Sequence, residues 1–322
     1  METTMKTYLT KFLAIALIAF VTNSIAQSTK PLTLVVPFPP GGATDQLARV
    51  VAQKLTEKKG YLIVVENKPG AGSQVAINAI KQTPADGMTL FIGDIGAYSL
   101  NRHLYSQLSY DTEVDLQPVT LVGKAPLFLM IPANSPYKSL PDLISAGKID
   151  NISYGSPGVG TGAHVAAEML RTKTGMKLTH IPYRGAGPAL VDLASGQIAF
   201  MFDPLASSMP FIKDGRLRAL AVASPTRNKL MSELPTVSEL GAEGVNFTAW
   251  FGIAVKAGTQ PAIVRRLNQD ISEVISASDV VKRFAEIGIE VSPTTVEAFE
   301  KLISNDAKTY GPVIKALNIK LD

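Results

Sequence analysis

Short apolar runs alternate with helical patterns along the first third of the chain. The runs Leu32–Val36, Tyr61–Val65 and Met88–Ile92 are each long enough for one buried strand. Between the first two, residues 45–55 place Leu47, Val50, Val51 and Leu55 on one face of a helix. Residues 73–82 repeat this register between the second and third runs. The order strand, helix, strand, helix, strand is typical of a parallel sheet with crossover helices.

The same alternation continues with different content. Further strands are predicted at residues 151–155, 177–181, 197–202, 217–223 and 249–255, and helices at 164–171, 188–194, 261–276, 279–287 and 295–310. The C-terminal block holds one strand and cannot build its own sheet, so we expect it to complete the first lobe. The prediction is an α/β fold of two lobes, each a mixed, mostly parallel sheet flanked by helices, with a hinge between them. Lobe 1 comprises residues 31–125 plus 248–322, and lobe 2 comprises residues 126–247.

The N-terminus has the pattern of an export signal. Lys6 and Lys11 precede the apolar run Phe12–Val21, and Ser24 and Ala26 place small residues at the −3 and −1 positions of a cleavage site. The run is about half the roughly 20 residues that a membrane span needs. We therefore expect residues 1–26 to be a signal peptide cleaved near Ala26; the alternative is a retained anchor.

The composition excludes several kinds of functional site. The chain has no cysteine, which excludes disulfides, thiolate metal sites, a cysteine nucleophile and a lipidated cysteine. Its net charge of +4 is small and dispersed, which argues against nucleic acid as a partner. The three histidines, His103, His164 and His180, have no metal-binding spacing. No cofactor and no metal are expected.

Two glycine-rich loops lie between a predicted strand and a predicted helix. In residues 37–45, Gly41 and Gly42 let the backbone approach a ligand, and the following helix offers unpaired N–H groups and the positive end of its dipole. Such a loop can bind an anion with backbone alone, aided by the Thr44 hydroxyl. The alternative is a plain tight turn. Asp45 is expected to cap the helix or pair with Arg49.

The second loop, residues 155–164, repeats the device with four glycines and the hydroxyls of Ser156 and Thr161. The P-loop lysine and the GxGxxG spacing are both missing, which disfavours a nucleotide site. His164 falls in the first helical turn, where we expect capping or packing.

Three more strand ends face the same way. In residues 182–189, Tyr183 offers a phenol, and Arg184 could bind a carboxylate or remain solvated. The segments 93–98 and 202–207 add Gly93, Asp94 and Asp203. An aspartate facing the pocket would favour a ligand that carries an amino group or donates hydroxyls; otherwise it caps a helix. Ligands of open α/β sheets bind at these carboxyl ends.

Seven motifs occur in order along the chain: PFPPGGATDQLAR, ENKPGAG, PADGMTLFIG, SYGSPGVGTGAH, HIPYRGAGPAL, DGRLRALAVASPTR and ELPTVSELG. This series resembles the Bug family, the substrate-binding components of tripartite tricarboxylate transporters. The resemblance implies a type II periplasmic-binding-protein fold, in which a ligand carboxylate is held between two lobes that close like a Venus flytrap. The positions it implies for ligand binding are Phe38, Pro40, Gly42, Ala43, Thr44, Asp45, Ser156, Gly160, Thr161, His164, Tyr183, Gly185 and Asp203. Ser73 departs from the family pattern, which commonly has glycine there.

The resulting hypothesis is a periplasmic, monomeric solute-binding protein that is not an enzyme. It would capture a small organic carboxylate and deliver it to two integral membrane transporter subunits. One alternative is a ligand-sensing subunit for a membrane histidine kinase. A second is a periplasmic hydrolase with Ser156 as nucleophile and His164 as base, although no GxSxG or HExxH motif occurs.

Overall fold

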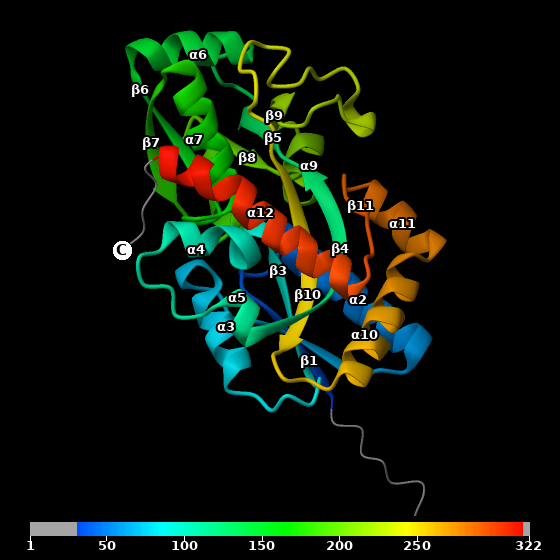
Figure 1. The fold of residues 1–322 in the computed structure, drawn as a ribbon. Helices are drawn as coiled ribbons and strands as arrows, with labels where there is room; N and C mark the ends of the chain where they lie inside the picture. Colours follow the sequence, from blue (N-terminus) through cyan, green and yellow to red (C-terminus); the bar gives the residue numbers. More distant parts are fainter. Residues whose placement is uncertain (1–30, 318–322) are drawn as a thin grey trace, which may run out of the picture. The chain divides into compact units, whose positions relative to one another are not determined.

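Two mixed β-sheets organise the part of the chain that the structure describes. The computed structural model describes residues 31–317, so the predicted signal peptide lies outside the described residues. The first sheet has the strand order β11-β4-β10-β3-β1-β2 and the second the order β7-β6-β8-β5-β9. Helices flank both sheets (Figure 1). The α/β, two-lobed fold predicted from the sequence is confirmed.

The parallel part of the first sheet follows the predicted pattern. β1 (Leu32–Val36) lies between β2 (Ile63–Asn67) and β3 (Thr89–Asp94) and is parallel to both. The crossover helices are α2 (Ala43–Lys59) and α3 (Gln74–Lys81). Leu47, Val51 and Leu55 of α2 are buried, as its apolar face requires.

Antiparallel strands extend this sheet. β10 (Thr248–Lys256) pairs with β3 on one side and with β4 (Leu116–Pro126) on the other, and β11 (Glu290–Val291) pairs with β4. The sequence did not reveal β4, because Pro118, Gly123 and Lys124 interrupt its apolar pattern.

In the second sheet, β6 (Asn151–Ser156) is parallel to β7 (Lys177–Pro182) and β8 (Phe200–Asp203). β5 (Phe128–Pro132) is antiparallel to β8 and to β9 (Leu217–Val222). β8 begins three residues later than predicted, since residues 195–199 form the turn that leads into it.

The remaining helices have the following bounds: α4 Asn101–Leu104, α5 Thr112–Asp115, α6 Leu140–Ile149, α7 Gly162–Thr174, α8 Ala186–Ala194, α9 Leu205–Lys213, α10 Pro261–Ile275, α11 Ser278–Ala285 and α12 Val296–Ala316. A π-helical turn, η3, spans Gly96–Leu100, and 3-10 turns span Ala71–Ser73 (η2) and Lys229–Met231 (η4). No helix in residues 31–317 is long and apolar enough to cross a membrane.

Three backbone segments run side by side where the chain passes between the sheets. Leu127, between β4 and β5, accepts a hydrogen bond from the Ala223 amide (2.7 Å) and donates one to the Phe247 carbonyl (3.4 Å). The Phe247 amide in turn donates to the Ala223 carbonyl (2.8 Å). In Figure 1, β4 and β10 lie alongside each other as they leave this point. The two sheets are thus joined by a narrow ribbon of hydrogen-bonded backbone.

Candidate functional site

The β1–α2 loop is held in shape by Asp45. This carboxylate is only 2% exposed, and it accepts hydrogen bonds from the Gly41 amide (3.0 Å), from Asn67 Nδ2 (2.9 Å) and from two Arg49 nitrogens (3.0 Å each). Burial alone would raise the pKa of Asp45, but the bonds from Arg49, Asn67 and Gly41 outweigh it and lower that pKa. Asp45 is therefore an anionic brace behind the loop, as the sequence indicated.

The β6–α7 loop is braced from within. The Thr161 hydroxyl donates to the Gly158 carbonyl (2.8 Å), and the Gly160 amide donates to His164 Nδ1 (3.2 Å). Gly158 and Gly160 have positive φ angles of 152° and 82°, which a residue with a side chain rarely adopts. Here the glycines are required by the turn itself.

Four helix N-termini converge on a small cavity, which we call the inner chamber. Its walls include the first residues of α2 (Gly42, Ala43, Thr44), α7 (Thr161, Gly162, Ala163), α8 (Ala186) and α9 (Pro204, Ser207), and its volume is about 60 Å³. None of these four helices has a side-chain N-cap. Ser139 and Thr295 cap α6 and α12, whereas α3, α10 and α11 also lack a side-chain N-cap, so it is the convergence of the four N-termini that distinguishes this chamber.

The first amides of α2 and α7 are free to bind a ligand. The first intrahelical bond of α2 runs from the Gln46 amide to the Gly42 carbonyl, and that of α7 from the Val165 amide to the Thr161 carbonyl. The preceding amides of each helix have no acceptor among residues 31–317. Together with four dipoles of the same sign, they form a strong site for a negatively charged group.

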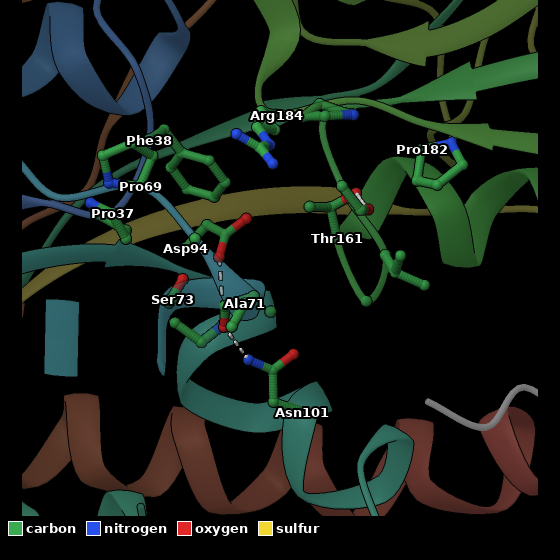
Figure 2. Close-up of a pocket in the computed structure, with 18 of the residues that line it drawn as sticks. Pro37, Phe38, Pro69, Ala71, Ser73, Asp94, Asn101, Thr161, Pro182 and Arg184 are labelled. Atoms are coloured by element: carbon green, nitrogen blue, oxygen red, sulfur yellow. Dashed lines mark hydrogen bonds between the residues drawn. The ribbon is translucent and has the colours of Figure 1, made fainter. Parts of the chain in front are cut away.

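A larger cavity of about 240 Å³, which we call the outer chamber, adjoins the inner one. The two share Phe38, Asp94, Pro157 and Thr161. Figure 2 shows the outer chamber, with Asp94 and Asn101 on one side and Arg184 on the other. Its walls also include the segment Pro69–Ser73 and Tyr105.

Asp94 is fixed at the boundary between the chambers. One oxygen, Oδ1, accepts a hydrogen bond from the Ala97 amide (3.2 Å) at the start of the π-helical turn. Burial raises the pKa of Asp94 to about 6, against the lowering effect of backbone amides. No ion pair of Asp94 occurs within residues 31–317.

Asp203 lies in the wall of the inner chamber. Its Oδ2 accepts a hydrogen bond from the Ser207 hydroxyl (2.5 Å), whereas Oδ1 is buried without a partner in the described residues. Burial raises its pKa to about 8, which favours the protonated form of this carboxyl at neutral pH. A protonated carboxyl can donate a hydrogen bond to an anion instead of repelling it.

Ser156 does form a pair with a histidine, but with His180 (Oγ to Nε2, 2.7 Å) and not with His164. The His164 and His180 rings stack at 4.1 Å, and burial lowers their pKa values to about 4 and about 3. Ser156 is 0% exposed, so a substrate cannot reach its hydroxyl. His164 packs and accepts a loop amide, as expected from the sequence; the hydrolase arrangement with His164 as base is wrong.

The structure gathers nine of the predicted site residues around the two chambers: Phe38, Gly42, Ala43, Thr44, Asp94, Gly160, Thr161, Tyr183 and Asp203. Six others lie outside both linings: Pro40, Asp45, Gly93, Ser156, His164 and Gly185. Gly93 is inside β3, where an added Cβ would lie 2.5 Å from the Phe91 ring. Gly185 instead faces the other lobe, and an added Cβ there would lie 2.8 Å from Pro39 Cδ.

Sequence reasoning missed the segment Pro69–Ser73 and Asn101. Ala71 and Ser73 have positive φ angles of 45° and 77°, so Ser73 adopts the conformation for which glycine is suited. The Gly72 carbonyl accepts a hydrogen bond from Asn101 Nδ2 (2.6 Å), which ties this loop to the π-helical turn. The motif ENKPGAG, residues 66–72, was the one feature of the sequence that could have indicated this segment. Within residues 31–317, no group of three or more metal-ligating side chains occurs.

Comparison with known proteins places the chain among receptors. Residues 47–319 match the model of the family described as "Tripartite tricarboxylate transporter family receptor". Protein BugT of Bordetella pertussis is 33% identical over 313 residues, which cover 96% of each chain.

Two solved structures of bacterial proteins are similar to this chain over most of its length. The structure "R. palustris Rpa4515 with adipate" has 32% identity and a TM-score of 0.89, covering 92% of this chain and 100% of that one. MatC (Rpa3494) from Rhodopseudomonas palustris, with bound malate, has 28% identity and a TM-score of 0.85, covering 89% of this chain and 99% of that one.

Proposed function

This chain belongs to the family of tripartite tricarboxylate transporter receptors, and we propose that its inner chamber binds one carboxylate group of a small organic acid. Receptors of this family are periplasmic solute-binding proteins, not enzymes. The observation that carries the proposal is the convergence of four uncapped helix N-termini on one cavity. Adipate and malate, the ligands of two similar structures, are both carboxylates.

The ligand contacts follow from the two loops. The amides that open α2 and α7 are the donors to the carboxylate, Thr44 adds a hydroxyl, and the protonated carboxyl group of Asp203 adds a further donor. Phe38 and Tyr183 supply apolar walls. Pro40, Asp45, Ser156, His164 and Gly185 act behind this surface, by shaping the loops.

We assign the hinge to the backbone ribbon at Leu127, Ala223 and Phe247. Lobe 1 would comprise residues 31–125 plus 248–322, and lobe 2 residues 126–247, because β10 belongs to the first sheet and β5 to β9 to the second. Gln46 Nε2 of α2 donates to the Ala206 carbonyl of α9 (2.8 Å), a bond that crosses between the sheets and favours a closed cleft.

Delivery of the ligand completes the proposal. The mature protein, cleaved near Ala26, would present the closed lobes as a monomer to two integral membrane subunits. N-terminal sequencing of exported protein tests the cleavage site, and co-purification with integral membrane proteins tests the partners.

The test of function is a thermal-shift screen against mono- and dicarboxylates, followed by calorimetry of the best compounds. A ligand at about 100 times its dissociation constant stabilises the protein by about 2.7 kcal/mol. The amide analogue of each acid is the matched control and should produce no shift. Binding of the amide as tightly as the acid would refute a carboxylate site.

A further inference from the structure

Asp94 places a negative acceptor in a cavity that otherwise attracts anions. It is the last residue of β3, and it lines both chambers. The amides of α2 and α7 draw a carboxylate to the inner chamber, so the next atoms of a bound acid must pass Asp94 to enter the outer chamber.

The side chain of Asp94 is fixed but only half satisfied. Oδ1 accepts the Ala97 amide at 3.2 Å, while Oδ2 has no hydrogen bond or ion pair within residues 31–317. Figure 2 shows the carboxyl group directed into the cavity, on the side facing Arg184. Arg184 comes from the opposite lobe, and no salt bridge joins the two side chains. The free oxygen is therefore presented to whatever fills the cavity.

An unsubstituted acid fits this arrangement poorly. Its methylene groups would cover Oδ2 without giving it a donor, and a buried acceptor that loses its solvent and gains no partner is costly. An ionised Asp94 would in addition repel the carboxylate beside it. A donor on the ligand removes both penalties, and an ammonium group would also neutralise the charge.

We propose that the ligand is a carboxylate that also carries a hydrogen-donating group, an ammonium or a hydroxyl, close to its carboxylate, and that Asp94 Oδ2 receives this donor. This inference rests on the proposed function, since it assumes the carboxylate in the inner chamber. Burial, which raises the pKa of Asp94 to about 6, is consistent with a carboxyl group that is left without a counter-charge.

The experiment compares matched triads of ligands by calorimetry at neutral pH. Each triad contains a parent acid, its 2-hydroxy derivative and its 2-amino derivative, built on propionate, succinate, glutarate, adipate and phenylacetate. In the triad that binds best, at least one substituted acid should bind about tenfold or more tightly than its parent, which is the order expected for a hydrogen bond to a charged group. The ranking of the amino and hydroxy compounds identifies the donor.

Asp94→Asn is the test variant. Its amide oxygen can still accept the Ala97 amide, while its NH₂ group replaces the free acceptor with a donor, so the preference for substituted acids should fall below about threefold. The matched control is Asp86→Asn, at an exposed position in the turn before β3, which should keep the wild-type ranking. If Asp94→Asn does not fold, the wild-type ranking still decides.

The outcomes separate the two proposals. A parent acid that binds as tightly as both derivatives overturns the role of Asp94 and leaves carboxylate binding intact. A preference that survives unchanged in Asp94→Asn also overturns it. If no acid in any triad binds, the inference and the proposed function fail together.

Discussion

An added methyl group at Gly185 should separate ligand binding from folding. Gly185 precedes α8 in one lobe and packs against Pro39 of the β1–α2 loop in the other. In Gly185→Ala, the new Cβ would lie 2.8 Å from Pro39 Cδ, well inside van der Waals contact. This overlap exists only while the two lobes touch.

The free-energy cost of Gly185→Ala has two parts. The φ angle of 120° lies in a region that costs a residue with a side chain about 1–3 kcal/mol, and this strain is present whether the cleft is open or closed. The overlap with Pro39 costs about 1–3 kcal/mol more, but only in the closed state. Because ligand binding requires closure, the second part should weaken binding by about five- to 150-fold.

The control for the backbone strain is Gly196→Ala. Gly196, just beyond the other end of α8, has a φ angle of 81°, and an added Cβ meets nothing within 4 Å. Both variants should unfold at lower urea concentration than the wild type. In calorimetry with the best carboxylate of the screen, only Gly185→Ala should bind weakly. Equal affinities for the two variants would show that closure does not bring Gly185 against Pro39.

Three further changes test the framework around the site. Burial lowers the pKa of His164 to about 4 in the folded protein, below its unfolded value of about 6.5, so the contribution of His164 to stability should fall by about 2 kcal/mol between pH 7 and pH 5. Urea titrations at the two pH values check this: wild type should lose about 2 kcal/mol more than His164→Gln, and an equal loss in both contradicts it. Asp45→Ala removes four hydrogen bonds from the first loop and should cost about 2–4 kcal/mol; a thermal midpoint equal to wild type would show that the brace is dispensable. Trp250→Phe removes the bond from the indole N–H to Asp306 (2.6 Å) and should cost about 1–3 kcal/mol in urea unfolding, whereas an unchanged midpoint would mean that water replaces the indole.

The parts of the site that depend on local sequence were predictable. An apolar run followed by two glycines and an amphipathic helix specifies a strand, a tight turn and a helix N-terminus, so the β1–α2 and β6–α7 loops were found. The interaction of Asp45 with Arg49 was predictable for the same reason, because residues four apart on a helix are neighbours.

The parts that depend on distant contacts were not predictable from one sequence. Asn101 lines the outer chamber and donates a hydrogen bond to the Gly72 carbonyl. Ser156 contacts His180 only because β6 and β7 pair in parallel. The π-helical turn whose Ala97 amide binds Asp94 packs Tyr98 against Trp250 at 5.7 Å, a contact between residues that are far apart in the sequence. The close approach of Gly93 to Phe91 and of Gly185 to Pro39 was likewise not predictable without the folded structure.

The most direct test is a crystal structure of the protein with its best carboxylate ligand. We predict that one carboxylate group lies in the inner chamber, with its oxygens 2.7–3.1 Å from backbone amides that open both α2 and α7, a distance typical of charge-assisted hydrogen bonds. A ligand whose carboxylates contact only side chains of the outer chamber, with the helix N-termini bound to water, would contradict the account.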